Sequence, residues 1–332
     1  MKQNKACRTA LALQVAVSAM VAAAAGSAFA QENWPSRPIR MVVPSPGGSG
    51  PDVLARVFAE QISQALKQPV VVDNKPGANG QLSVDAVVRA QPDGYTLLLA
   101  SASATVMNQA IQPKLPFNVV KDLVAVAQIG AGGVLLVVTP DFPARDVKDF
   151  VSVVKANPNK YAYGTWGIGS GGHLAMAQLH TLTGVELTHV PYKGVPPIMT
   201  DLQGGVMNIA FVDITTSVPL VKSGKIRALG ITGKHRAPAF PDVPTMAEQG
   251  YPMTNEGWYG LFVPKGTSPQ IVATLNREIN RALRAPALTT RFQQLNMMAE
   301  PPLTTPDEFA RTVRNDYATW TDVVKANHIK PE

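Results

Sequence analysis

Short apolar runs alternate along the chain with longer amphipathic stretches. Most of the apolar runs have apolar residues on both faces, which is typical of a parallel sheet covered by helices. They predict β-strands at Ile39–Val43, Val70–Asp73, Tyr95–Ala100, Val124–Ile129, Val134–Thr139, Tyr161–Thr165, Leu187–Tyr192, Asn208–Phe211, Ile226–Ile231 and Gly260–Val263.

The stretches between these runs carry apolar residues at helical spacing. Pro51–Leu66 places Leu54 and Phe58 in one apolar stripe. Two later helices are marked by their first residues, Ser268 followed by a proline and the capping box Thr305–Glu308. Strands that alternate with helices at this spacing indicate an α/β fold.

The first 30 residues have the pattern of a secretory signal peptide. Lys2, Lys5 and Arg8 precede an alanine-rich apolar run, and Ala28-Phe29-Ala30 supplies a small-x-small cleavage pattern. We expect export and cleavage before Gln31. Removing 30 of the 332 residues leaves 302 and lowers the formal net charge from +7 to +4, because three basic and no acidic residues are lost.

The composition after cleavage excludes several classes of function. Cys7 is the single cysteine and lies in the leader, so disulfides, thiolate catalysis and cysteine-bound metals are excluded. No further apolar segment of the sequence approaches membrane-spanning length, and no dense lysine and arginine block suggests nucleic-acid binding. A chain of this length is long enough for two cores.

The sequence contains no long flexible linker between the two expected cores. We instead expect strands to cross between lobes near Ile129–Val134 and near Glu248–Gly257. The expected division is a discontinuous lobe 1 of residues 31–130 and 251–332, with residues 131–250 as lobe 2.

Two glycine-rich turns, Pro44–Asp52 and Thr165–His173, each follow a predicted strand and precede a helix. Glycines let a ligand approach the main chain, and a helix start offers unpaired N–H groups with a partial positive charge. Either turn alone is equally compatible with an ordinary tight connection. Two such turns in one chain favour a site for an anion.

Other chemistries fit these turns poorly. Gly167-x-Gly169-x-x-Gly172 matches the dinucleotide-binding fingerprint, but the following strand ends in Val190-Pro191 and lacks the acidic residue that would hold a ribose. Neither Ser49 nor Ser170 has the glycine spacing of a nucleophile elbow. We therefore expect no cofactor.

Histidines and acidic residues supply candidates but no catalytic set. His173 and His180 are too far apart for a helical zinc pair, and His173 either lines a cleft or caps and packs. Asp52 has a structural alternative, offsetting the dipole of its helix, and Asp213 could cap the segment after it. No pair of carboxylates suggests acid–base catalysis, so we expect neither a metal site nor an enzyme.

Separated motifs, in a fixed order, resemble the Bug-type (TctC-like) solute-binding receptors of tripartite tricarboxylate transporters. The resemblance runs from Trp34 to Glu332. Each motif is weak alone, but the ordered set is specific. It includes Pro46-Gly47-Gly48, Asn74-Lys75-Pro76-Gly77-Ala78, Pro92-Asp93-Gly94-Tyr95, Gly167-x-Gly169-Ser170, His189-Val190-Pro191-Tyr192-Lys193-Gly194 and Asp242-Val243-Pro244-Thr245.

The resemblance implies a periplasmic Venus-flytrap fold: two α/β lobes, each a mostly parallel sheet flanked by helices, joined by two crossing strands. It also implies that main-chain groups and waters of the two glycine turns hold the carboxylate of a small organic anion. The residues expected at the ligand are Ser45, Pro46, Gly47, Gly48, Asp52, Ser101, Ser103, Thr165, Trp166, Gly167, Gly169, Ser170, His173 and Asp213.

Two positions depart from the pattern of this family. Relatives often carry an aromatic residue where this chain has Ser45, and Ser-Ser where it has Thr165-Trp166. One hypothesis is that Trp166 shrinks the cavity or stacks on a flat ligand such as an aromatic carboxylate. The alternative is that its indole packs between the lobes.

These observations predict a monomeric periplasmic binding protein without enzymatic activity. It would capture a small di-, tri- or aromatic carboxylate and deliver it to integral-membrane transporter subunits. A carboxylate sensor that presents its closed form to a signalling partner would use the same fold and cleft. An exported enzyme is the other class of function, and the number of ligand carboxylates is left open.

Overall fold

The computed structural model describes residues 34–48, 50–77, 80–286, 288, 292 and 303–330. Met1–Ser36 and Arg37–Glu332 form separate units, and both sheets belong to the second unit. The predicted signal peptide, residues 1–30, lies outside the described residues. No helix in the described part of the chain is long and apolar enough to cross a membrane.

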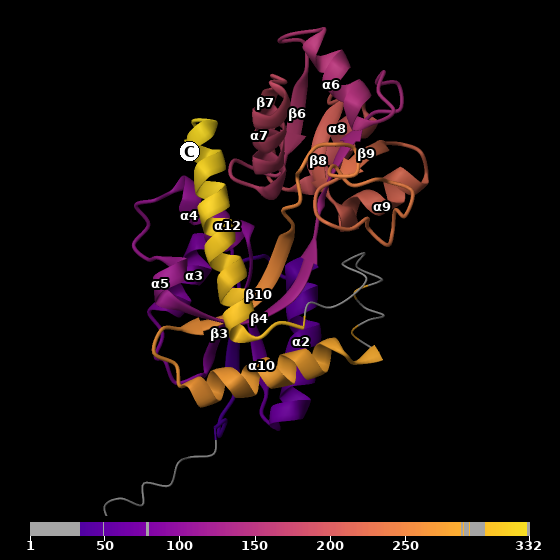
Figure 1. Ribbon diagram of the computed structural model, residues 1–332. Coiled ribbons are helices and arrows are strands. Elements are labelled where there is room, and N and C mark those ends of the chain that lie inside the picture. The colour runs from indigo at the N-terminus through magenta and orange to yellow at the C-terminus, as the bar shows by residue number, and fades with distance from the viewer. Residues whose placement is uncertain are drawn as a thin grey trace, which may run out of the picture. The chain divides into compact units, whose positions relative to one another are not determined.

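Two five-stranded sheets organise the second unit (Figure 1). The first has the order β2-β1-β3-β10-β4 and contains β1 (Ile39–Val43), β2 (Val70–Asn74), β3 (Thr96–Ser101), β4 (Leu123–Gly132) and β10 (Gly257–Pro264). The second has the order β7-β6-β8-β5-β9 and contains β5 (Val134–Val138), β6 (Ala162–Thr165), β7 (Thr188–Pro191), β8 (Ile209–Asp213) and β9 (Arg227–Ile231). Every predicted strand is present, and most have ends shifted by one to a few residues.

Each sheet contains one strand that runs against the others. β10 is antiparallel to β3 and β4, and β5 is antiparallel to β8 and β9. The pairs that β1 makes with β2 and β3, and β6 with β7 and β8, are parallel. The remaining strands of each sheet therefore share one direction, which confirms the prediction of two mostly parallel sheets.

The chain crosses between the sheets twice. β4 ends at Gly132 and β5 begins at Val134, and a Cβ on the intervening Gly133 would lie 1.8 Å from the carbonyl oxygen of Thr232. This close approach requires glycine. The chain returns through residues 232–256, and the two predicted crossing segments overlap both connections. The two antiparallel strands, β5 and β10, are the strands that directly follow these crossings.

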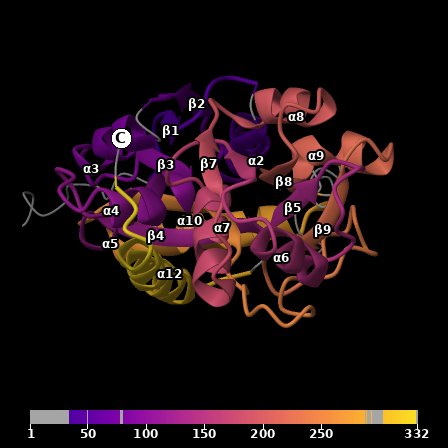
Figure 2. The ribbon, with the colours of Figure 1, turned by 90° about the horizontal axis from the view of Figure 1, so that it is seen from above.

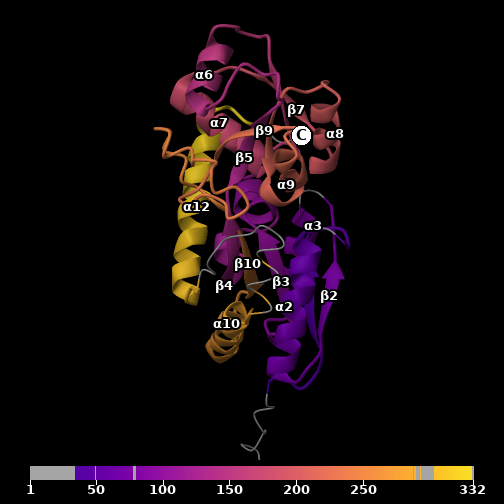
Figure 3. The same cartoon turned by 90° about the vertical axis from the view of Figure 1, so that its right-hand side faces the viewer.

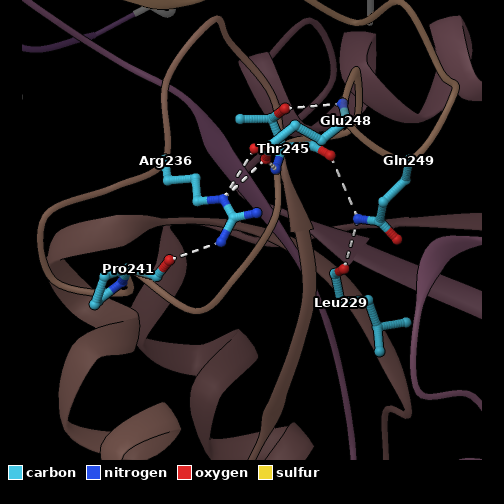
Figure 4. Close-up of polar contacts among 6 residues, drawn as sticks. All are labelled: Leu229, Arg236, Pro241, Thr245, Glu248 and Gln249. Atoms are coloured by element: carbon cyan, nitrogen blue, oxygen red, sulfur yellow. Dashed lines mark hydrogen bonds and ion pairs between the residues drawn. The ribbon is translucent and has the colours of Figure 1, made fainter.

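A polar cluster holds the return connection against the second sheet (Figure 4). Arg236 donates through Nε to both carboxylate oxygens of Glu248, which also accepts the Thr245 amide at 2.6 Å. The next side chain, Gln249, donates to the carbonyl oxygen of Leu229 in β9 at 3.0 Å. These bonds stabilise a proline-rich segment that lacks regular structure over most of its length.

Helices pack on both sheets. Those of the first sheet are α2 (Gly50–Leu66), α3 (Gln81–Val88), η2 (Ser103–Met107), α4 (Asn108–Ile111), α5 (Val119–Asp122), α10 (Pro269–Leu283) and α12 (Pro306–Ala326). Those of the second are α6 (Val147–Lys155), α7 (Gly171–Thr183), α8 (Val195–Gln203) and α9 (Ile214–Lys222). The predicted capping box is present, with Thr305 and Glu308 each bonding the other's amide.

The long helix α12 contacts elements of both sheets. It packs on β4 and also on α7, as Figure 2 and Figure 3 show. Near its start, Phe309 meets Trp258 edge-on, with ring centroids 5.1 Å apart. Leu174 of α7 belongs to the same apolar cluster. This helix therefore brings its later residues, including Trp320, to the region between the sheets.

Candidate functional site

A cavity of about 550 Å³ is lined by residues from both sheets. The first sheet contributes Leu99–Ala104 and Gly257–Tyr259, and the connection Ala131–Val134 joins the two walls. The second sheet contributes Trp166 and Asp213. Helices also begin here, because Pro51 of α2, Gly171 of α7, Val195 of α8 and Ile214 of α9 all line the cavity.

Four of the predicted ligand residues lie in the wall of the first sheet: Ser45, Pro46, Ser101 and Ser103. Ser45 is 8 % exposed, and its hydroxyl has no hydrogen-bond partner among the described residues. The Ser101 hydroxyl accepts the amide of Ala104 at 3.3 Å, which fixes the turn after β3. The turn that carries Ser101 and Ser103, both expected at the ligand, is thus part of the cavity lining.

The other predicted ligand residues of the first glycine turn, Gly47, Gly48 and Asp52, lie outside the lining. Asp52 is 2 % exposed and accepts hydrogen bonds from the Gly48 amide at 2.7 Å, from Arg56 at 3.0 Å and from Asn74 at 2.9 Å. Burial raises the pKa of Asp52, but these three hydrogen bonds outweigh it and hold the pKa below its usual value. Asp52, with Gly47 and Gly48, shapes the turn behind Ser45.

Trp166 lines the cavity and packs on the core of the second sheet. A Cβ on Gly172 would lie 2.8 Å from its ring, and one on Gly171 would lie 3.4 Å away. The indole therefore covers the first turn of α7, where the two glycines make room for it. The structure shows Trp166 packed within its own half of the molecule, while its stacking on a ligand stays a prediction.

The other predicted ligand residues of the second glycine turn lie outside the lining and bond to one another. Ser170 caps α7 by accepting the His173 amide at 3.3 Å, and Nδ1 of His173 accepts the Gly169 amide at 3.0 Å. The hydroxyl of Thr165 donates to the carbonyl oxygen of Gly167 at 3.2 Å. The capping alternative for His173 is thus the one its contacts show.

Two imidazoles stack behind this turn. The rings of His173 and His189 have centroids 4.1 Å apart and planes 6° apart, and Nε2 of His189 lies 2.7 Å from the Thr165 hydroxyl. Burial lowers the pKa of His173 to about 4. Burial, and then the charge of His173, lower the pKa of His189 to about 3. Both rings are therefore neutral near pH 7.

Asp213 occupies the end of β8, where it caps α9 by accepting the Thr216 amide at 2.8 Å, as the sequence suggested. It also lines the cavity. Burial, and then the negative charge of Asp213, raise the pKa of Tyr259 to about 12. Tyr259 is in the lining as well, so the two side chains share one region of the wall.

Several lining residues were missed by the sequence analysis, including Asn255, Trp258, Tyr259 and Trp320. Trp320 lies in the helix that follows the predicted capping box, and nothing in the sequence marks it or Asn255 as a ligand residue. Nδ2 of Asn255 and Nε1 of Trp320 are buried and have no hydrogen-bond partner among the described residues. The described lining includes no lysine, arginine or histidine, and the described residues hold no cluster of three metal-ligating side chains.

Solved structures with the same fold are periplasmic binding proteins. A periplasmic transporter among them is 38% identical, with a TM-score of 0.79 and coverage of 90% of this chain and 99% of that one. The Rhodopseudomonas palustris protein MatC, solved with malate, is 33% identical, with a TM-score of 0.76 and coverage of 88% and 100%. Rpa4515 of R. palustris, solved with adipate, is 32% identical, with a TM-score of 0.79 and coverage of 90% and 100%.

Sequence relatives agree with this assignment. Protein BugT of Bordetella pertussis is 37% identical over 320 residues, which cover 95% of this chain and 98% of that protein. The model of the tripartite tricarboxylate transporter family receptor matches residues 54–329. This is a family of solute-binding receptors and not of enzymes. The chain therefore belongs to the tripartite tricarboxylate transporter receptor (TctC) family and is a Bug-type member of it.

Proposed function

We propose that this chain is a periplasmic receptor that captures a small organic carboxylate in the cavity between its sheets and delivers it to membrane transporter subunits. Buried hydrogen-bond donors in the cavity wall support this proposal most strongly. The Ser45 hydroxyl, Asn255 Nδ2 and Trp320 Nε1 lack partners among the described residues. Buried polar groups are almost always hydrogen-bonded, and a carboxylate supplies strong acceptors.

The helix starts supply the favourable potential that basic side chains provide elsewhere. α2, α7, α8 and α9 all begin at the cavity, and each N-terminus carries a partial positive charge. A carboxylate can therefore be held without an arginine. The relatives solved with adipate and malate make carboxylates the first ligands to test.

Of the residues predicted at the ligand, those in the cavity wall are proposed to contact it. Those outside the lining are proposed to hold the wall residues in place. The wall residues are Ser45, Pro46, Ser101, Ser103, Trp166 and Asp213. In this proposal, residues 31–130 and 251–332 form lobe 1 and residues 131–250 form lobe 2. The signal peptide directs export and is removed by cleavage before Gln31.

A thermal-shift panel tests this function. The mature protein is heated with adipate, malate, citrate and benzoate, and separately with the corresponding amides. Ligand at a hundred times its Kd stabilises the folded state by about 2.7 kcal/mol, so a bound carboxylate raises Tm by several degrees while its amide does not. Equal responses to acids and amides would contradict the proposal.

A pair of asparagine variants localises the site. Asn255→Ala removes a cavity donor and is expected to weaken carboxylate binding about tenfold. Asn157→Ala is the matched control, because the Asn157 amide bonds the carbonyl oxygen of Val153 at the end of α6. Delivery is tested separately by uptake of the labelled carboxylate into cells with and without this gene.

A further inference from the structure

Asp213 is the one charged side chain among the described residues that line the cavity. Its carboxylate accepts the Thr216 amide as the cap of α9. Capping alone does not require a charge, because asparagine caps a helix as well as aspartate does. A carboxylate has acceptor sites for several hydrogen bonds, so a side chain that caps a helix can also bond to a ligand group.

The neighbours of Asp213 place it in an aromatic part of the wall. It lies directly opposite Val134 in the β5–β8 pair, so the two side chains share one face of the sheet. A Cβ on Gly171 would lie 3.7 Å from the Val134 side chain and 3.4 Å from the ring of Trp166, so Val134 lies beside the indole. Tyr259 is close enough for the Asp213 charge to contribute to raising the pKa of its hydroxyl.

We infer that the ligand carries a cationic nitrogen in addition to its carboxylate, and that Asp213 is the counter-ion for this nitrogen. The inference rests on the proposed function and narrows its ligand class. The ligand is thus an amino acid, an ω-amino acid or a betaine, whereas the sequence had suggested only a small di-, tri- or aromatic carboxylate.

The charges in the cavity lead to this ligand class. A plain carboxylate beside Asp213 would place two negative charges in a wall whose described residues include no basic side chain. Like charges in such a site repel strongly because the local dielectric is low. A cationic nitrogen on the ligand replaces this repulsion with attraction. Trp166 and Tyr259 add faces on which ammonium groups bind favourably.

Matched pairs of probes separate the effect of the positive charge from that of size. Titration calorimetry of the mature protein compares 6-aminohexanoate with adipate and aspartate with malate. It also compares glycine betaine with 3,3-dimethylbutyrate, which has the same shape without the charge. In at least one pair we expect the cationic member to bind ten times more tightly or better.

Two variants assign the preference to Asp213. Asp213→Asn keeps an acceptor for the Thr216 amide and removes the charge, so it is expected to abolish the preference while the melting temperature changes little. Asp146→Asn is the matched control, because Asp146 caps α6 through the Asp149 amide and is absent from the cavity lining. This control is expected to keep the preference.

The outcomes separate the two proposals. A preference that disappears in Asp213→Asn and persists in Asp146→Asn supports the inference. Plain carboxylates that bind as tightly as their cationic partners overturn the inference and leave carboxylate binding intact, and a preference that survives Asp213→Asn overturns the role of Asp213. Binding of no probe in any pair contradicts both the inference and the proposed function.

Discussion

At the scale of single residues, Gly260 shows how closely the packing fixes residue type. A Cβ at this position in β10 would lie 2.1 Å from an atom of the Phe309 ring, which is 0 % exposed. The ring of α12 therefore rests directly on the strand backbone. Because the ring is enclosed by Trp258 and Phe262, it has little room to move away.

Gly260→Ala is expected to lower the free energy of unfolding by about 1–3 kcal/mol, because overpacking forces the ring or the strand to shift. Urea unfolding measures the change. Gly204→Ala is the control, since a Cβ there meets its nearest atom at 3.4 Å, and its effect should stay within about 0.5 kcal/mol. Equal losses in both variants would contradict this account of the core.

Trp166→Ala removes an indole that covers the start of α7 and lines the cavity. We expect benzoate to lose affinity relative to adipate, because the aromatic surface available for stacking is gone. Calorimetric titration of both acids with wild-type and variant protein measures the ratio. An unchanged ratio would show that Trp166 serves packing alone.

The sequence identified cavity residues that lie in local motifs and missed those brought in by long-range pairing. Ser45, Ser101 and Trp166 follow predicted strands, and strand ends in α/β folds carry binding sites. Asn255 and Trp320 come from the return connection and from α12, and both reach the wall through contacts with distant parts of the chain. No local pattern distinguishes them from other loop and core residues.

At the scale of elements, the stack of His173 on His189 joins α7 to β7 behind the second glycine turn. Neither ring is part of the cavity lining. The folded protein holds them neutral, whereas the unfolded chain takes up protons below about pH 6.5. Protonation therefore favours the unfolded state.

Stability is expected to be fully present above about pH 6.5 and to fall as the pH is lowered toward about 4. The pKa of His173 in the fold lies near 4, so this histidine alone accounts for a loss on the order of 1–2 kcal/mol by pH 5. Urea unfolding between pH 7.5 and 5 measures the slope. His189→Phe keeps an aromatic ring and should reduce the slope, while the exposed His235→Asn should leave it unchanged.

The longer elements were predictable because their apolar periodicity is strong, as in β1, which has the predicted ends. The short helices after β3 were not predicted. Residues Ser103–Met107 form a π-helical turn there, with the Thr105 hydroxyl bonded to the carbonyl oxygen of Ser101 at 2.8 Å. Such short segments depend on side-chain and tertiary contacts that periodicity does not report.

At the scale of the whole molecule, two sheets, two crossings and α12 create one cavity from segments far apart in the sequence. The connection at Gly133 leaves no space for a side chain. The ion pair between Arg236 and Glu248 stabilises the return connection, residues 232–256. Sequence motifs predicted this architecture and the carboxylate class. They did not predict that the described residues of the cavity wall would combine buried donors, aromatic rings and a single acidic side chain.

Mass spectrometry of the ligand retained by the purified mature protein tests the central claim most directly. The protein is isolated without added ligand, examined intact under native conditions, and then denatured to release and identify what it held. The account predicts a small organic carboxylate that also bears a cationic nitrogen. A released carboxylate without such a nitrogen would contradict the role of Asp213, and a released molecule without a carboxylate would contradict the proposed function itself.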